Sequence, residues 1–285
     1  AFDLRTLYPS LIMTANLSTE CFMQDKTNSC ITVKGFNIDL NKKGFLVEVV
    51  KGLIEEKQRY KKLMQNEVVN SDKYKLYYNR QFAIKTGVLN PVYGQTAYIG
   101  SRYYDPKIAE ITTYLGRQII TWSKKVLEKF GFEVLYMDTD SLYYTGNRVL
   151  TSEDIEKTRN KLNESYNEFI MTELGKKIPH NLEMEWDKVY RKAFFGQAKK
   201  RYAGHVIYES GQKVDYLQVV GFEVRRSDAA QFSRNLQSVI FDMILRQDKS
   251  KDDVLRFVGN EISRLRTGNF MFSEIGIPKG TASEG

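Results

Sequence analysis

Apolar residues recur at intervals of three and four in several long stretches of the chain, as they do on the buried face of an amphipathic helix. In the first stretch they include Phe45, Val49 and Leu53, and the segment becomes basic toward its C-terminal half. The pattern predicts helices over residues 44–66, 71–89, 106–130, 152–174 and 228–265. We expect the first two of these helices to form an antiparallel pair.

Shorter apolar runs bounded by polar turns predict strands. Residues 134–137 and 142–144 flank the polar tetrapeptide 138–141, the composition of a β-hairpin with acidic residues at its tip. Residues 1–4 predict a short strand, and residues 189–220 predict further strands interrupted by turns. Helices and hairpins together predict an α+β fold with a mostly antiparallel sheet.

The length and composition are those of a soluble globular protein. A chain of 285 residues can bury one sizeable core or form two to three lobes. No apolar run approaches the ~20 residues of a membrane span. Cys21 and Cys30 lie nine apart without a second cysteine pair or a histidine cluster, so we expect neither a zinc site nor a disulfide scaffold, and a reducing compartment. The chain starts at Ala1 without an initiator methionine or a signal peptide, so we expect a fragment of a longer, non-secreted protein.

The net charge of +8 favours a polyanionic partner such as nucleic acid. A basic but merely solvated surface would give the same number, so the charge needs support from specific positions.

Three aspartates are candidates for metal chemistry. Asp3 follows the first apolar positions, and Asp138 and Asp140 occupy the tip of the expected hairpin. An Asp-x-Asp turn is most often a local Asx-turn. Here the acids stand between two apolar strands, where their mutual repulsion favours a bound cation. They would form one site only if the two strands lie side by side.

Three segments of the chain resemble the motifs of family B DNA polymerases, in the family's order. Residues 3–10 (DLRTLYPS) are similar to the first motif, with Thr6 in place of Ser. Residues 90–94 (NPVYG) are similar to the second, and residues 136–141 (YMDTDS) to the third, with Met137 in place of Gly. Chance agreement of ordered motifs at sensible spacing is rare.

Further matches follow the phage and archaeal members, namely residues 102–105 (RYYD), 199–202 (KKRY) and 221–226 (GFEVRR). The resemblance thus spans nearly the whole chain.

The resemblance implies the architecture of a right-hand polymerase. A palm with an antiparallel sheet would comprise residues 1–43 and 96–223. Helical fingers would comprise residues 44–95, and a partial helical thumb residues 224–285.

The resemblance also implies the metal site. Asp3 and Asp140 would ligate two Mg²⁺ ions, for which Mn²⁺ could substitute, with Asp138 nearby and the Leu4 carbonyl as a further ligand. These residues would catalyse attack of a primer 3′-hydroxyl on a deoxynucleoside triphosphate. Glu185 would be either a further carboxylate near the metals or a plain surface acid.

The nucleotide would contact the first motif. The Thr6 and Leu7 amides would face the triphosphate, and Tyr8 would pack under the sugar and exclude a 2′-hydroxyl. The alternative for Tyr8 is ordinary core packing.

The fingers would hold the triphosphate. Lys57 stands where the family has an arginine and Lys61 where it has a lysine; they are four apart and share one face. The family's other lysine stands four residues before Asn90, whereas Lys85 is five before it. We expect a kink to turn Lys85 toward the phosphates. A solvated basic helix face is the alternative for Lys57 and Lys61.

That kink would come from Pro91, which replaces a serine of the second motif and removes a backbone hydrogen bond. Asn90 and Tyr93 of this motif are further candidate nucleotide contacts.

The DNA duplex would contact Lys199, Lys200, Arg201, Tyr202 and Arg225. We expect Lys200 and Tyr202 to alternate on a strand, share a face and reach the minor groove. An exposed basic strand is the alternative. No histidine is assigned a role.

The implied partners are primer–template DNA, deoxynucleoside triphosphates and the N-terminal and exonuclease part of a longer parent protein. The implied location is cytoplasmic, at the nucleoid or a phage replication site, without a membrane. Two rival functions remain: a fragment that binds DNA or nucleotide without efficient turnover, and another palm enzyme such as a reverse transcriptase.

Overall fold

The computed structural model describes residues 1–209 and 211–277, which form two compact units. The first comprises Phe2–Trp186, and the second comprises Ala1 with the chain from Asp187 onward. The boundaries expected for palm, fingers and thumb remain predictions. In the described ranges, no helix is long and apolar enough to cross a membrane.

The first unit is built on a four-stranded sheet in which every neighbouring pair is antiparallel. Its order is β5 (Glu133–Asp138), β6 (Ser141–Thr145), β1 (Phe2–Leu4) and β7 (Met184–Trp186). The short N-terminal strand is therefore central, and Phe2, Leu142 and Met184 are fully buried. The expected hairpin is confirmed, and so is the antiparallel sheet.

Two long helices pack against this sheet. Helix α5 (Pro106–Lys129) contacts β5 and β6, and α6 (Ser152–Leu174) contacts β7. Asp105 caps α5 by accepting a hydrogen bond from the Lys107 amide, and Thr151 and Asp154 form a capping box on α6. Both helices are confirmed within a residue of their predicted bounds.

Helix α1 (Leu7–Thr14) follows β1 and packs on α5. A 3₁₀ turn (Thr19–Cys21) leads to a small antiparallel sheet of order β2 (Phe22–Met23), β4 (Phe36–Asp39) and β3 (Cys30–Val33). Cys21 and Cys30 are both buried, free cysteines.

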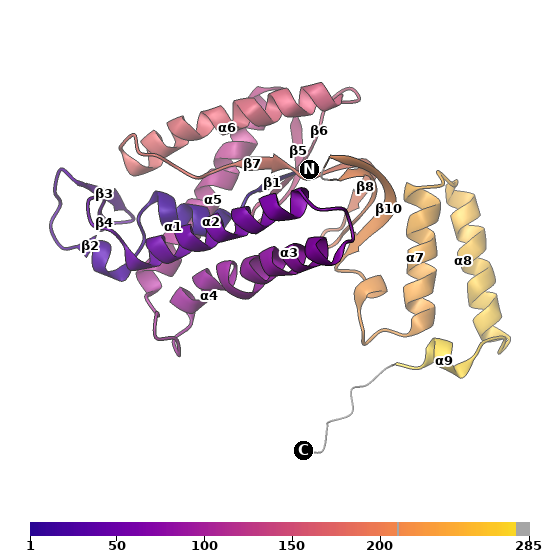
Figure 1. Cartoon of the computed structure of the whole chain (residues 1–285). Coiled ribbons are helices and arrows are strands. Elements are labelled where there is room, and N and C mark those ends of the chain that lie inside the picture. The colour runs from indigo at the N-terminus through magenta and orange to yellow at the C-terminus, as the bar shows by residue number, and fades with distance from the viewer. Residues whose placement is uncertain (210, 278–285) are drawn as a thin grey trace, which may run out of the picture. The chain divides into compact units, whose positions relative to one another are not determined.

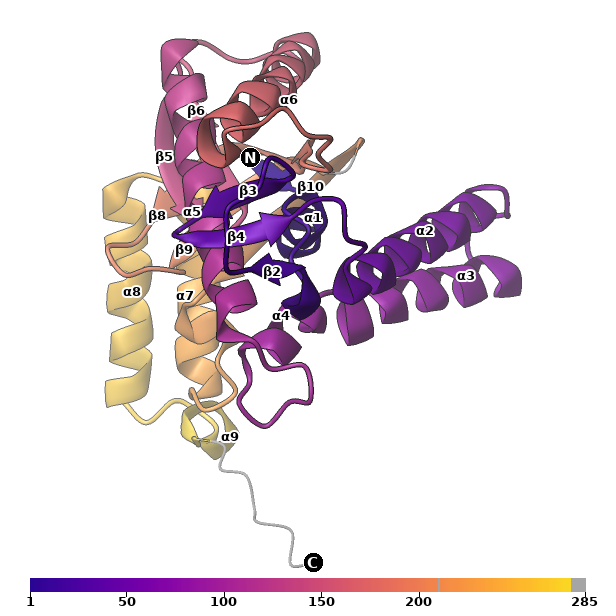
Figure 2. The same ribbon diagram turned by 90° about the vertical axis from the view of Figure 1, so that its left-hand side faces the viewer.

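The expected antiparallel helix pair projects as a hairpin of α2 (Phe45–Gln65) and α3 (Asp72–Ala83) (Figures 1 and 2). The Tyr60 hydroxyl on α2 accepts a hydrogen bond from Arg80 on α3 at 2.8 Å. The predicted helix 71–89 changes character at its end, where Ile84–Leu89 is a π-helical segment. Helix α4 (Pro91–Ala97) follows directly.

The second unit contains an antiparallel sheet of order β10 (Gln212–Val220), β9 (Tyr202–Glu209) and β8 (Lys188–Phe195). A 3₁₀ turn (Glu223–Arg225) leads to helices α7 (Gln231–Leu245), α8 (Lys251–Arg266) and α9 (Phe272–Ile275). Ala203 and Val219 of the sheet share an apolar core with Phe241 and Leu245 of α7.

The prediction of one helix over residues 228–265 is wrong, because the chain turns between α7 and α8. Ser250 and Asp253 form a capping box that starts a new helix, and Asp248 has a left-handed backbone with φ of 55°. The break has a local signal that was missed, because residues 246–253 (RQDKSKDD) contain no apolar residue and Ser250 stands three residues before Asp253.

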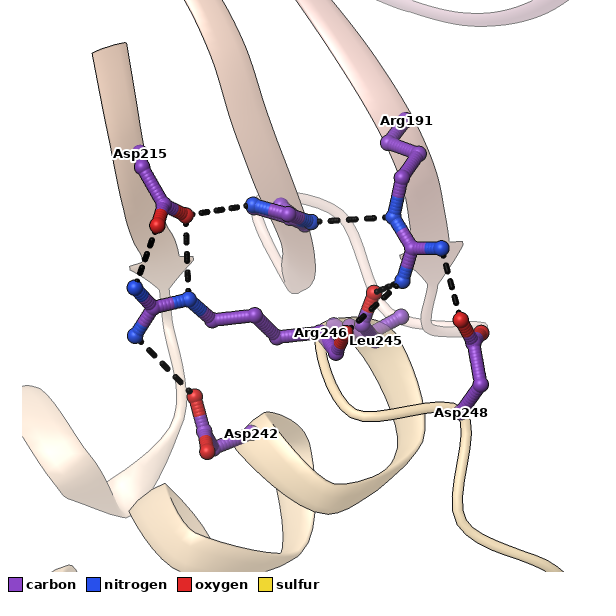
Figure 3. A network of polar contacts seen from close by, with 7 residues as sticks. Arg191, Asp215, Asp242, Leu245, Arg246 and Asp248 are labelled. Atoms are coloured by element: carbon purple, nitrogen blue, oxygen red, sulfur yellow. Dashed lines mark hydrogen bonds and ion pairs between the residues drawn. The ribbon is translucent and has the colours of Figure 1, made fainter.

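Arg191 of β8 ties this turn to the sheet (Figure 3). Its guanidinium donates to the Leu245 carbonyl at 2.8 Å and the Arg246 carbonyl at 3.0 Å, and it pairs with Asp248 at 2.6 Å. Two carbonyls at the C-terminal end of α7 thereby gain a hydrogen-bond donor.

His205 of β9 joins this contact to a second ion pair. Its Nδ1 accepts from Arg191 Nε at 3.1 Å, so the proton of the neutral ring is on Nε2, which lies 2.7 Å from Asp215. Asp215 in turn accepts two hydrogen bonds from Arg246 at 2.9 and 2.5 Å. Both ring nitrogens of this buried histidine therefore have hydrogen-bond partners within the second unit.

We expect acid to weaken the attachment of α7 and α8 to the sheet. Arg246 and then His205 lower the pKa of Asp215 to about 2, and Arg191 and Lys192 lower that of Asp248 to about 2. A lowered carboxyl pKa gives stability that is complete above the ordinary value near 4 and is lost as the pH falls toward 2. The protection factors of the α7 and α8 amides in hydrogen exchange should fall between pH 5 and pH 2.

The matched variant for this measurement is Asp215→Asn. Its α7 and α8 amides should have lower protection factors than the native chain already at pH 5, and these factors should change less on acidification. An unchanged pH dependence in Asp215→Asn would refute the assignment to this carboxylate.

Candidate active site

The antiparallel pairing of β1 with β6 brings two of the predicted catalytic aspartates together. Asp3 lies in register with Ser141, whose hydroxyl donates to Asp3 Oδ1 at 2.7 Å and lies 3.5 Å from Asp140 Oδ1. The Leu4 amide donates to the Asp140 carbonyl at 2.8 Å. The strands therefore lie side by side, and one hydroxyl is within reach of both carboxylates.

Asp138 ends β5 in register with the same serine, Ser141. The hairpin turn is closed by the Asp140 amide, which donates to the Asp138 carbonyl at 2.6 Å, and Thr139 has a left-handed φ of 53°. Thr139 also donates its hydroxyl to Asp138 Oδ1 at 3.2 Å. Sequence reasoning missed the bridging position of Ser141, because only the pairing of β1 with β6 creates it.

Strand β7 brings a fourth carboxylate beside Asp3. Glu185 is the cross-strand neighbour of Asp3 and lies 3.6 Å from the Arg5 guanidinium, which also pairs with Glu183 at 2.9 Å. Neither earlier alternative for Glu185, a carboxylate near the metals or a plain surface acid, included this ion pair.

The Asp3 and Asp140 side chains offer carboxylate oxygens, the ligands that hard divalent cations prefer. Within the described part of the chain, no group of three or more His, Cys, Asp or Glu side chains is arranged to hold a metal by itself. Mg²⁺ is usually held by one or two carboxylates together with waters and substrate phosphates. Asp3 and Asp140 could supply such a pair, with a triphosphate as the remaining oxygen donor.

Two predicted nucleotide contacts, Tyr8 of α1 and Tyr93 of α4, pack against each other. Their ring centroids are 4.5 Å apart at an interplanar angle of 51°. Gly116 of α5 leaves room for the first ring, since a Cβ built on it would lie 3.3 Å from Tyr8 Cε1. Part of the core-packing alternative for Tyr8 therefore holds, because its ring rests on two helices.

The backbone before α1 is unusual. Thr6 has a left-handed φ of 44°, and the helix begins at the next residue, Leu7, whose side chain is buried. The N-terminus of a helix carries amide groups and a partial positive charge suited to phosphate. The placement of Thr6 and Leu7 is compatible with their predicted role, which remains a prediction.

The predicted phosphate-binding lysines lie in one electrostatic neighbourhood. Burial lowers the pKa of Lys57 below its ordinary value, and repulsion from Lys85, Arg5 and Lys61 adds to this lowering, against a smaller opposing attraction from Glu185. Mutual repulsion of cations is relieved by a bound polyanion.

The π-helical segment changes the spacing between Lys85 and Asn90. The Asn90 amide donates to the Lys85 carbonyl at 3.0 Å, so this hydrogen bond joins residues five apart, whereas an α-helix joins residues four apart. Thr86, the residue four before Asn90, donates its hydroxyl to the Phe82 carbonyl at 2.8 Å. A wide π-helical turn thus precedes Pro91, and the expected kink that would turn Lys85 toward the phosphates stays a prediction.

The prediction that Lys200 and Tyr202 alternate on a strand is wrong. Strand β8 ends at Phe195, and Lys199 and Lys200 lie in the turn before β9, which starts at Tyr202. Lys200 has a left-handed φ of 60°.

Gly221 packs closely on that turn. A Cβ built on it would lie 1.9 Å from the Lys200 carbonyl oxygen, so only glycine fits there. Arg201 donates to the Gly221 carbonyl at 3.1 Å and lies 5.6 Å from the centre of the Phe222 ring, and Arg225 donates to the Val219 carbonyl at 3.3 Å. The predicted DNA-binding residues Lys199, Lys200, Arg201, Tyr202 and Arg225 all belong to the second unit; their contact with DNA remains a prediction.

The chain is similar in sequence to archaeal DNA polymerases. It is 32% identical over 279 residues to the DNA polymerase of Archaeoglobus fulgidus, covering 98% of this chain and 32% of that protein. It is 33% identical over 267 residues to the DNA polymerase of Desulfurococcus sp. (strain Tok), covering 92% of this chain and 32% of that protein. The chain thus spans about a third of the length of the curated relatives it matches.

The fold is likewise similar to a solved structure, that of the family B DNA polymerase of Pyrobaculum calidifontis. The TM-score is 0.72 at 24% sequence identity, and the match covers 97% of this chain and 33% of that one. The sequence model of DNA polymerase family B matches residues 1–282. The chain therefore belongs to DNA polymerase family B.

Proposed function

We propose that the chain is a polymerase core that adds deoxynucleotides to a primer 3′-hydroxyl under the direction of a DNA template. The observation that carries the proposal is the approach of the Asp3 and Asp140 carboxylates to the same Ser141 hydroxyl at 2.7 and 3.5 Å. Membership of the family and its archaeal relatives supports the assignment.

Asp3 and Asp140 would hold two Mg²⁺ ions, with Asp138 and the Leu4 carbonyl beside them. When bound, such ions lower the pKa of an attacking hydroxyl and neutralise charge on the leaving pyrophosphate. The role of the chain is to hold these carboxylates in fixed positions on adjacent strands, so that little reorganisation is needed during reaction.

The nucleotide would be oriented by two groups of residues from the first unit. Lys57, Lys61 and Lys85 would bind the triphosphate, and Lys57 does so without the bidentate fork of an arginine, so binding should be weaker. Tyr8, supported by Tyr93, would pack against the sugar.

The remaining parts complete the proposal. Residues 1–43 and 96–223 would act as palm, 44–95 as fingers and 224–285 as partial thumb. The basic turn at Lys199–Arg201 would hold the primer–template duplex. The proposed site of action is the nucleoid or a phage replication site in the cytoplasm.

Primer extension tests this function. The chain is incubated with a short primer–template, Mg²⁺ and all four deoxynucleotides, with EDTA added to a parallel reaction. Extension that is lost with EDTA is expected. Tight binding of the primer–template without extension would instead favour the second candidate, a chain that binds DNA but turns over poorly. The observation that raises this candidate is that the chain spans about a third of the length of its relatives.

Tyr8→Ala is expected to raise the use of ribonucleotides relative to deoxynucleotides by roughly tenfold or more, because the ring that would meet a 2′-hydroxyl is removed. The ratio of kcat/KM for the two nucleotides measures this. Tyr8→Phe is the control: it keeps the ring on Tyr93 and Gly116 and should keep the discrimination. No gain in Tyr8→Ala would remove the role of Tyr8 and reopen the reverse transcriptase alternative.

A further inference from the structure

Helix α3 carries two aromatic side chains on its exposed surface. Tyr78 is 46% exposed and Phe82 is 53% exposed. The two residues are four apart, so they lie on the same side of the helix. Their rings are nearly parallel, with an interplanar angle of 12° and centroids 6.2 Å apart. Large side chains held parallel and open to solvent offer flat faces to a ligand.

These rings are separate from the contact between α2 and α3. The preceding residue, Tyr77, faces that contact, with its ring centroid 6.2 Å from that of Tyr60. One residue is a rotation of about 100° on a helix, so Tyr78 lies on a neighbouring face. Packing of the hairpin therefore gives no reason for aromatic residues at Tyr78 and Phe82.

Lysines stand at both ends of the aromatic pair. Lys75 precedes Tyr78 by three residues on α3, which places it on the same side of the helix as the two rings. Lys85 follows Phe82 by three residues, in the π-helical segment that continues α3. The segment 45–89 carries nine Lys and Arg residues against five Asp and Glu. We call Lys75, Tyr78, Phe82 and Lys85 the α3 stripe.

Alternating cations and exposed rings match the chemistry of an unpaired nucleic acid strand. Bases stack on aromatic rings, and the phosphates between them pair with lysines. A duplex hides the faces of its bases, so it could use only the lysines. An apolar protein surface would use only the rings and would leave both lysines without counter-charge.

We propose that the α3 stripe binds the unpaired template strand ahead of the nucleotide being copied. The inference rests on the proposed polymerase function, because Lys85 belongs both to this stripe and to the lysine group near the proposed triphosphate site. The stripe would hold one or two bases stacked on Tyr78 and Phe82, independent of their sequence.

Fluorescence anisotropy on the whole 285-residue chain tests the proposal. Two labelled primer–templates are compared, one with a 5′ template overhang of about ten nucleotides and one with an overhang of a single nucleotide. The native chain should bind the long overhang more tightly. The double variant Tyr78→Ala/Phe82→Ala should bind it about tenfold more weakly and bind the short overhang unchanged. Leu76→Ala, which removes an equally exposed apolar side chain (48%) from another face of α3, should behave as native.

Each other outcome overturns the proposal in a recognisable way. Equal affinity of the native chain for the two overhangs, or a double variant that keeps the difference, excludes the α3 stripe while DNA binding stands. A double variant that loses affinity for both overhangs equally, with an unchanged circular dichroism spectrum, indicates a duplex contact. Failure of the native chain to bind either DNA removes the proposed function together with the stripe. A native dimer that the double variant makes monomeric identifies the face as a contact between copies of the chain.

Discussion

Asp140→Asn is expected to reduce the rate of primer extension by at least about a thousandfold, the equivalent of roughly 4 kcal/mol of transition-state stabilisation. Asparagine keeps the size of the side chain but removes the charge that would hold a divalent cation. The rate of single-nucleotide incorporation at saturating deoxynucleotide measures the loss. Binding of Mn²⁺, followed by its electron paramagnetic resonance signal, should weaken in parallel and provides a readout independent of turnover.

Two further variants test whether this loss is specific to the Asp140 carboxylate and whether the Ser141 hydroxyl contributes. Asp25→Asn removes an exposed carboxylate elsewhere in the first unit and should leave extension unchanged. Ser141→Ala keeps both carboxylates but removes the hydroxyl between them, so a smaller loss of about tenfold is expected. Activity of Asp140→Asn within tenfold of the native chain would exclude this carboxylate from the reaction.

The hairpin of β5 and β6 and the long helices of the first unit could be predicted from the sequence because their signals are local. The hairpin around Asp138 and Asp140 follows from two apolar runs with a polar turn between them, and helices α2, α5 and α6 follow from their apolar periodicity. The approach of Asp3 to Asp140 depends on the pairing of strands 138 residues apart in sequence, for Asp3 with Ser141, and no local pattern specifies such a pairing.

The omission of the His205 contacts and the error at Lys200 share that cause. His205 has no local partner in sequence, and its environment is made by Arg191 and Asp215 from the neighbouring strands. The turn at Lys200 depends for its fit on Gly221, twenty-one residues later. Positions at which the chain meets itself from a distance were therefore the ones that periodicity could not supply.

Exchanging Lys85 and Thr86 by the double substitution Lys85→Thr/Thr86→Lys is expected to raise the KM for deoxynucleotides by about 10- to 100-fold, the effect of losing a hydrogen bond to a charged group. In a regular α-helix the exchange would help, because it would place a lysine four residues before Asn90, where the family has one. In the π-helical segment the Asn90 amide bonds to the Lys85 carbonyl, so the residue one turn away is Lys85 itself. Steady-state kinetics at saturating primer–template measures the change.

Deleting Gly87 is the complementary variant, since it shortens the wide turn by one residue. Gly87 has no neighbour within 4 Å of a Cβ built on it, so its removal disturbs no packing there. A π-helical turn that loses one residue can close as a regular α-helical turn, and Lys85 would then stand four residues before Asn90. The KM of this deletion variant should stay within about threefold of the native value. A low KM for the exchange variant together with a high KM for the deletion would show instead that the helix is regular in solution and that position 86 faces the triphosphate.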